Sequence, residues 1–182
     1  MASSPSSIPT LQVLERLPYI DDQGHLPEHL SGTVGVYAIF SQDQTLQYVG
    51  YSRNVLLSLQ QHLIRQPQSC HWVKVHTIER PQRSVLEEIR DTWLAENGTT
   101  PAGNGAAESD WTQPIDATQQ MTPDERVAYE AAATEGERAK ALKTVARRVE
   151  GAIATQLKER GLADPIRFDP KLKDQGLLNV KP

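Results

Sequence analysis

Residues Thr33 to Gln61, TVGVYAIFSQDQTLQYVGYSRNVLLSLQQ, contain the strongest secondary-structure pattern of the chain. They hold two runs rich in β-branched and aromatic residues, 33–40 and 46–51, and such side chains favour strands. The polar residues between the two runs are typical of a turn, so the runs are predicted to form a hairpin. A helix is expected to begin near Ser52 or Asn54. Its apolar face is indicated by residues that recur at helical spacing: Val55, Leu56, Leu59 and Leu63.

The composition of the chain limits which kinds of partner and site it can have. The chain has 182 residues and a formal net charge of −4. This charge argues against avid, non-specific binding of nucleic acid, although a local basic patch remains compatible with it. Cys70 is the one cysteine, which excludes an internal disulfide and a cysteine-based zinc site. No apolar run has the length of a membrane span, and a cytoplasmic location without membrane contact is expected.

Changes in composition predict four segments. Residues 1–25 are expected to be a flexible N-terminal segment, because their beginning is rich in Ser and Pro. Residues 26–104 should form the folded core. Residues 105–121 are polar and rich in small residues, which indicates a linker. Residues 122–182 are predicted to be a helical extension with a C-terminal tail.

Further elements follow from periodicity. Residues 71–78 alternate as a half-buried strand does, and residues 83–96 have helical spacing. Residues 11–17 could form a short helix, and two helices are predicted in the extension, over 122–133 and 135–160. The order of elements predicts an α+β fold, with a small mixed β-sheet of about three strands flanked by helices.

The hairpin also carries a family resemblance. The tripeptides GVY at residues 35–37 and YVG at residues 48–50, ten residues apart, resemble the paired signature of the GIY-YIG nucleases, and SRN at residues 52–54 resembles that family's turn into its first helix. The resemblance implies a GIY-YIG-like core and hydrolysis of phosphodiester bonds in DNA. In that chemistry a helix glutamate holds one Mg²⁺ or Mn²⁺, a sheet tyrosine helps to activate water, and an arginine stabilises phosphate charge.

Four residues match the family pattern. Tyr37 and Tyr48 correspond to the signature tyrosines, predicted to lie near the attacking water and the scissile phosphate. Two strand aromatics in a small core are the alternative explanation. Gly50 would let a substrate group approach the backbone closely. Asn104 matches the asparagine that closes the family core, and it is predicted to be near the substrate.

The chain departs from the family at the arginine. Ser58 stands where the resemblance places the catalytic arginine, and serine carries no charge. Arg53 or, further along the helix, Arg65 could substitute for it. Arg53 or His62 is predicted to contact phosphate, with Ser58 as a substrate-binding residue. Arg53 could equally be a solvated residue at the start of the helix, and His62 an ordinary surface histidine.

A second departure affects the glutamate. By the family pattern its position corresponds to Arg90, one turn after Glu87. Glu87 is the predicted metal ligand, and Asp91 lies four residues further on the same face. An ordinary charged helix surface explains these carboxylates equally well.

The two departures together resemble the GIY-YIG-like module at the amino end of plastid monothiol glutaredoxins. This resemblance covers about residues 30–104, including a cysteine after a proline at residues 67–70, and it suggests a cyanobacterial source. The cysteine motif of a glutaredoxin domain is absent. Cys70 itself is expected to be a buried thiol, with a redox-sensitive handle as the alternative.

The sequence therefore predicts two alternative functions. The first is a divergent, weakly active, Mg²⁺-dependent endonuclease. The second is a catalytically degenerate GIY-YIG-like module that binds nucleic acid or a protein partner. An apolar stripe near heptad spacing in residues 135–160 also predicts a homodimer or a protein partner through that helix.

Overall fold

A four-stranded antiparallel sheet is the centre of the fold. The computed structural model describes residues 7–182, so the first six residues of the predicted flexible segment lie outside the described part. The strands are β1 (Leu17–Pro18), β2 (Val34–Phe40), β3 (Leu46–Ser52) and β4 (Trp72–Ile78), in the order β1-β4-β2-β3. The predicted α+β class is confirmed. The sheet is antiparallel throughout rather than mixed, and it has a fourth strand.

The fourth strand comes from residues predicted as a short helix. Residues 11–17 form only a 3₁₀ turn at Leu11–Val13, and the chain then extends into β1. Pro18 explains the difference, because a proline disfavours helical backbone in the residue before it. Leu17 pairs with Val73 of β4 instead.

The predicted hairpin of β2 and β3 is present, and its register sorts the side chains between two faces. Tyr37 is opposite Gly50, and Ala38 is opposite Val49. Because alternate residues of a strand point to opposite faces, Tyr37 and Tyr48 belong to one face and Val49 and Tyr51 to the other. Strand β3 is an edge strand, so its outer side is not covered by another strand.

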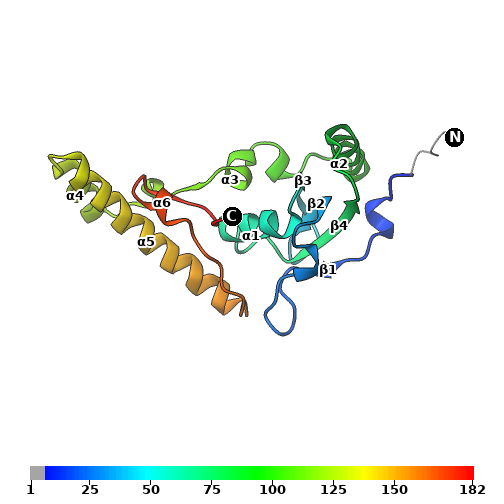
Figure 1. Ribbon diagram of the computed structural model, residues 1–182, viewed down its shortest axis with the longest axis horizontal. Helices are drawn as coiled ribbons and strands as arrows, with labels where there is room; N and C mark the ends of the chain where they lie inside the picture. The colour runs from blue at the N-terminus through cyan, green and yellow to red at the C-terminus, as the bar shows by residue number, and fades with distance from the viewer. Residues whose placement is uncertain (1–6) are drawn as a thin grey trace.

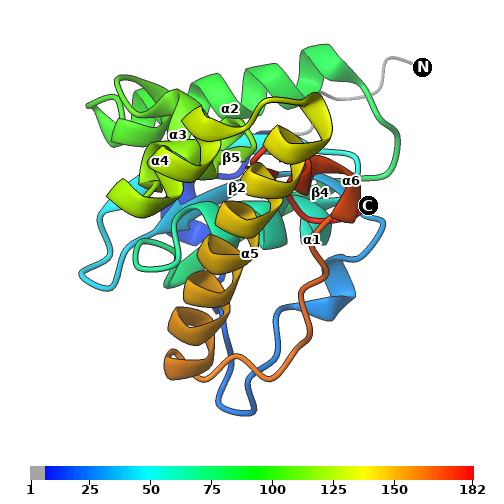
Figure 2. The same ribbon diagram turned by 90° about the vertical axis from the view of Figure 1, so that its left-hand side faces the viewer.

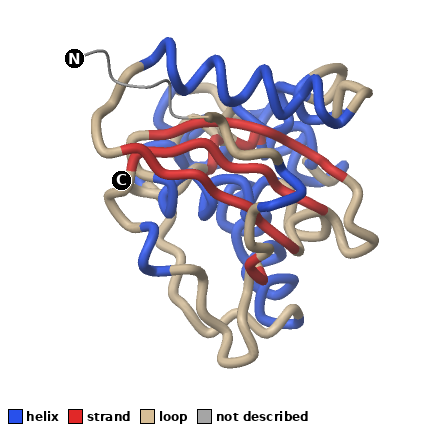
Figure 3. The backbone as a smooth tube through the Cα atoms, turned by 90° about the vertical axis from the view of Figure 1, so that its right-hand side faces the viewer, coloured by secondary structure: helices blue, strands red, loops and turns tan. Residues whose placement is uncertain are grey.

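One helix packs on each face of the sheet. Helix α1 (Val55–Arg65) begins at Asn54, whose side chain accepts a hydrogen bond from the Leu57 N–H. It packs on the face that holds Tyr37. Helix α2 (Arg83–Asn97) ends at Gly98, which has a left-handed backbone with φ of 80°. It packs on the opposite face, beside β3 and β2 (Figure 3).

The extension adds a second layer beside α1 (Figures 1 and 2). The segment predicted as a linker forms α3 (Glu108–Thr112) and β5 (Ile115–Asp116), and the extension forms α4 (Pro123–Ala131), α5 (Glu135–Glu159), α6 (Pro170–Lys173) and β6 (Leu177–Leu178). Further 3₁₀ turns are Glu28–Leu30, Ala102–Asn104 and Ala117–Gln120. The segment predicted as a linker is thus largely structured, and it buries Trp111 and Ala117 in the core.

The apolar face of helix α5 is buried against the rest of the protein. Capping boxes start both α4 and α5, at Thr122 and Thr134. The buried residues of α5 join the core cluster that contains Tyr37; they are Val145, Ala146, Val149, Ile153 and Leu157. The stripe that suggested a dimer is therefore covered by the protein itself. Among the described residues, no helix is both long enough and apolar enough to cross a membrane.

Candidate functional site

The two signature tyrosines converge on Gly50. A Cβ added at Gly50 would lie 2.9 Å from the Tyr37 hydroxyl, 2.9 Å from the Tyr48 hydroxyl and 2.5 Å from Cε1 of Tyr48. Only a residue without a side chain leaves room for this arrangement. The ring centroids of the two tyrosines are 6.2 Å apart. The sequence prediction that these residues share one place on the sheet agrees with this geometry.

His62 and Trp111 close the inner side of the tyrosine pair. The Tyr37 hydroxyl lies 2.9 Å from Nε2 of His62, and Trp111 stacks on Tyr48 with ring centroids 5.5 Å apart. Burial lowers the pKa of His62 to about 3, with a smaller contribution from Arg65. His62 is therefore a neutral, buried group that holds Tyr37, not the exposed helix histidine considered as an alternative.

Tyr37 is a weak acid in this position. It is only 3% exposed. Burial raises its pKa above the ordinary tyrosine value, followed by the influence of Tyr48, while the Ser58 hydroxyl acts in the opposite direction. A tyrosine that remains protonated can donate a hydrogen bond but cannot act as a base.

Ser58 and Arg53 lie in different surroundings. The Ser58 hydroxyl donates to the Ser52 hydroxyl at 2.7 Å, beside the tyrosine pair. Arg53 is exposed at the turn before α1 and lines a cavity of about 240 Å³ together with Tyr51 and Arg83. Ser58 thus belongs to the group formed by Tyr37 and His62. Arg53 instead lines the separate, exposed cavity beside Tyr51.

Glu87 is not grouped with Tyr37 and Tyr48. Its carboxylate accepts hydrogen bonds from the Tyr51 hydroxyl at 3.1 Å and from Nε of Arg83 at 2.8 Å. Helix α2 packs on the face of the sheet opposite Tyr37, so the sheet separates the two side chains. The Arg83 hydrogen bond, followed by that from Tyr51, lowers the pKa of Glu87.

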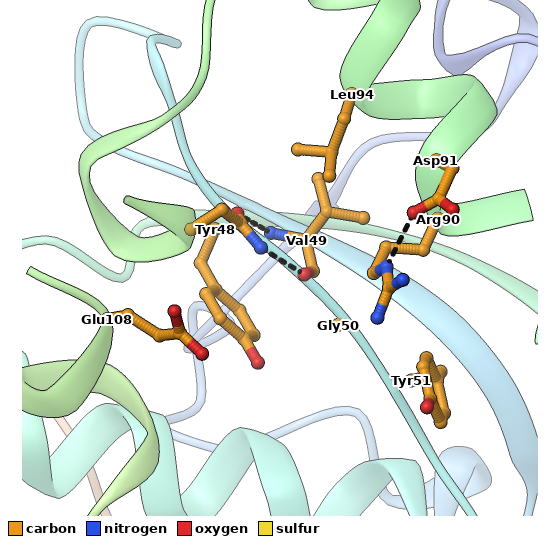
Figure 4. A pocket seen from close by; sticks show the side chains of 9 residues that line it. Tyr48, Val49, Gly50, Tyr51, Arg90, Asp91, Leu94 and Glu108 are labelled. Atoms are coloured by element: carbon orange, nitrogen blue, oxygen red, sulfur yellow. Dashed lines mark hydrogen bonds and ion pairs between the residues drawn. The ribbon is translucent and has the colours of Figure 1, made fainter. Parts of the chain in front are cut away.

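An open cleft of about 360 Å³ runs along the outer edge of β3 (Figure 4). It is lined by Tyr48 to Tyr51 of β3, by Arg90, Asp91 and Leu94 of α2, and by Asn104 and Glu108. Asn104 fixes the strand, because its side chain accepts from the Val49 N–H and donates to the Val49 carbonyl, both at 2.8 Å. The asparagine acts here as a backbone clamp.

The clamp reveals which backbone groups face the cleft. Val49 directs its N–H and carbonyl away from β2, toward Asn104. In an antiparallel ladder the direction repeats every second residue, so the N–H of Tyr51 points outward as well. It lies on the cleft, where a ligand oxygen could accept a hydrogen bond from it.

Arg90 is the cationic group of the cleft. Its guanidinium carbon lies 5.5 Å from the ring centre of Tyr51, and its Nε donates to Asp91 at 2.8 Å. No hydrogen bond from its Nη groups is found in the described part of the chain. Arg53 and Arg83 line the neighbouring cavity, which shares Tyr51 with the cleft. Arg53, Arg83 and Arg90 thus line two cavities that share Tyr51, with Arg83 paired to Glu87 and Arg90 paired to Asp91.

These residues do not fit the predicted Mg²⁺ site as they are arranged. A hard divalent ion needs several carboxylate or carbonyl oxygens that converge. Glu87 is already bound by Arg83 and Tyr51, Asp91 is paired with Arg90, and a guanidinium occupies the position expected for the family glutamate.

Sequence reasoning missed two contributors to the site. Trp111 was assigned to a linker, although a tryptophan in an otherwise polar segment signals an anchor. Arg65 was not considered as a structural residue. It donates from Nη1 to the Trp111 carbonyl at 2.9 Å and from Nη2 to Oδ1 of Asn179 at 3.1 Å, which ties α1 to the extension.

Cys70 is fully buried. Its thiol lies 3.7 Å from the His62 carbonyl, and burial raises its pKa to about 12. A thiol that is inaccessible and stays protonated is unreactive in the folded state.

Comparison with known proteins identifies one relative for part of the chain. The chain is similar to the bifunctional monothiol glutaredoxin-S16 of Arabidopsis thaliana, a chloroplast protein, with 33% identity over 103 residues. The similar region covers 54% of this chain and 33% of the relative, so the chain spans about a third of the length of that protein. No family model matches the chain. The predicted similarity to plastid monothiol glutaredoxins is thus supported, while the likeness to GIY-YIG nucleases rests on the motifs alone.

Proposed function

We propose that the chain is a catalytically degenerate GIY-YIG-like module that binds the phosphate groups of a nucleic acid at the edge of β3. The observation that carries this proposal is the gathering of Arg53, Arg83 and Arg90 around Tyr51. Arginine suits phosphate because its planar guanidinium donates paired hydrogen bonds and keeps its charge.

The surrounding groups support an anion as the ligand. Tyr51, whose N–H points away from β2, and Arg90, whose Nη groups have no hydrogen bond in the described part of the chain, both line the same cleft. A backbone donor beside a fixed cation is a common arrangement for a phosphate oxygen. The net charge of −4 argues for weak binding, since only this local cluster attracts the ligand.

A non-hydrolytic role fits the remaining geometry. Tyr37 is buried and protonated, and Trp111 stacks on Tyr48 on the inner side. Glu87, the predicted metal ligand, is engaged by Arg83 on the other face of the sheet. Binding without cleavage needs none of these groups to change partners.

The Mg²⁺-dependent endonuclease is the second candidate. It is favoured by the convergence of the Tyr37 and Tyr48 hydroxyls at Gly50 and by two carboxylates on the cleft, Asp91 and Glu108. For hydrolysis, Asp91 would have to leave Arg90.

One experiment separates the two candidates. Fluorescence anisotropy with labelled single-stranded DNA, single-stranded RNA and duplex DNA, at low salt with EDTA, measures metal-free binding. Nicking of supercoiled plasmid with Mg²⁺ or Mn²⁺ measures hydrolysis. We expect binding without nicking. Absence of binding to every oligonucleotide would overturn the proposal, and nicking that EDTA and Tyr37→Phe both abolish would establish the endonuclease instead.

A further inference from the structure

One histidine and two carboxylates lie together at a place outside the cleft. There the loop of residues 21–28 contacts the segment that follows α5. The three residues are His25, Glu28 and Asp164. One ligand atom from each lies within 4.8 Å of the others. Residues so distant in sequence are brought together by the fold itself, and the proposed function uses none of them.

The loop is shaped before any ligand arrives. The Asp21 carboxylate accepts hydrogen bonds from the N–H groups of Gln23 and His25, both at 2.9 Å. Gly24 has φ of +87°, and a Cβ there would collide with the carbonyl of Gly161. This glycine therefore lets the loop lie directly against the chain that follows α5 (Figure 2, lower edge).

Asp164 is held in place by the same contact. Its own N–H and that of Ala163 donate to the Gly24 carbonyl, at 3.3 Å and 2.8 Å. One carboxylate oxygen accepts from the Leu26 N–H at 2.8 Å, and the other lies 2.7 Å from Nδ1 of His25. The side chain of Asp164 is only 16% exposed, so this ligand is partly desolvated and oriented.

Glu28 differs from its two neighbours because its carboxylate forms no hydrogen bond or ion pair in the described part of the chain. It faces a cavity of about 390 Å³ that His25 also lines, which leaves room for an ion and a water molecule. The carboxylate of Glu28 is therefore available as a third ligand beside the pair formed by His25 and Asp164.

We propose that His25, Glu28 and Asp164 bind one Zn²⁺-like divalent cation that fastens the loop of residues 21–28 to the segment that follows α5. One imidazole nitrogen with two carboxylate oxygens suits Zn²⁺, whereas Mg²⁺ and Ca²⁺ prefer oxygen ligands alone. Four-coordinate Zn²⁺ holds its nitrogen and oxygen ligands at about 2.0–2.2 Å, which places them roughly 3.3 Å from one another. The metal would replace the proton between His25 and Asp164, and the pair would open by about half an ångström from its present 2.7 Å.

The test is a calorimetric titration of untagged, metal-free protein with Zn²⁺, followed by the same titration with Mg²⁺. We expect one Zn²⁺ per chain and no comparable Mg²⁺ binding. Glu28→Gln should weaken Zn²⁺ binding at least about tenfold, since even groups that only support ligands change affinity that much. The substitution removes no hydrogen bond, so the fold should persist. Asp22→Asn, an exposed carboxylate of the same loop, is the matched control and should leave the affinity unchanged.

A second readout follows from the position of the site. A ligand that binds only the folded state raises its stability by mass action, so Zn²⁺ should raise the melting temperature of the wild type and of Asp22→Asn. It should have little effect on His25→Asn. Absence of Zn²⁺ binding, or equal affinity in the wild type and Glu28→Gln, would overturn the proposal.

Discussion

The guanidinium of Arg90 lies over the ring of Tyr51, with its central carbon 5.5 Å from the ring centre, at the position where the family resemblance places a metal-binding glutamate. A cation there reverses the charge of the site. A carboxylate would hold a metal ion and approach phosphate through it, whereas a guanidinium can bind phosphate directly. This exchange is the basis for proposing a binding module.

Gly50 should be intolerant of even one added carbon. In Gly50→Ala the new methyl group would displace Tyr48 and Tyr37, whose nearest atoms would lie 2.5 and 2.9 Å away. Overpacking of this kind costs roughly 1–3 kcal/mol, measured as the free energy of unfolding in urea. Gly151→Ala is the control, because its Cβ would meet nothing within 4 Å on α5. It should stabilise the protein by about 0.5–1 kcal/mol. Equal effects of the two substitutions would contradict the packing described at Gly50.

His62 should make the protein less stable in mild acid. Its pKa is about 3 in the folded state against an ordinary value of 6.5. Between these values the unfolded chain binds a proton that the folded chain does not, so this stabilising contribution is present above pH 6.5 and is lost as the pH falls. The slope from this one residue approaches about 1.4 kcal/mol per pH unit.

Urea unfolding at several pH values checks the assignment to His62. In His62→Gln the decline of stability between about pH 7 and pH 4 should be shallower than in the wild type, although the variant should be less stable near pH 7, where it lacks the contact with Tyr37. His29→Gln, which removes an exposed histidine, should keep the wild-type slope. An unchanged slope in His62→Gln would show that this histidine is not buried in its neutral form.

Asn104 should hold the free edge of the sheet. Asn104→Asp keeps the acceptor for the Val49 N–H but sets a carboxylate against the Val49 carbonyl, where the amide now donates at 2.8 Å. Loss of one hydrogen bond with an unsatisfied carbonyl left behind costs about 1–3 kcal/mol. Asn97→Asp, at the exposed end of α2, loses a similar hydrogen bond to the Thr99 carbonyl and should cost less. If both variants unfold at the same urea concentration, the clamp is not structural.

Local sequence signals identified the regular elements of the core because their periodicity is strong. The hairpin of residues 34–52 follows from alternating β-branched residues, and the bounds of α1, α2 and α5 follow from caps and apolar spacing. Pro18 is a local signal against the helix predicted over residues 11–17, but strand β1 itself could not be predicted, since it is defined by its pairing with β4. Local patterns contain no information about such partners.

In the candidate site, too, some residues could be predicted from local sequence and others depend on tertiary contacts. The motifs singled out Tyr37, Tyr48 and Gly50, and the structure places these three residues next to one another. The position of Glu87 could not be predicted, because the spacing within α2 does not show on which face of the sheet that helix packs. Trp111 was assigned to a linker for a similar reason, as its burial depends on contacts with α1 and β3 that only the folded chain supplies.

The salt dependence of oligonucleotide binding shows whether Arg90 contacts phosphate. Affinity of the wild type, Arg90→Gln and Arg138→Gln for a labelled single-stranded oligonucleotide would be followed by anisotropy from about 50 to about 200 mM salt, in EDTA. If Arg90 binds phosphate, Arg90→Gln should weaken binding and reduce the slope of log affinity against log salt by about one. Arg138→Gln, an exposed arginine near the start of α5, should match the wild type. Equal affinities and slopes for all three proteins would contradict the account.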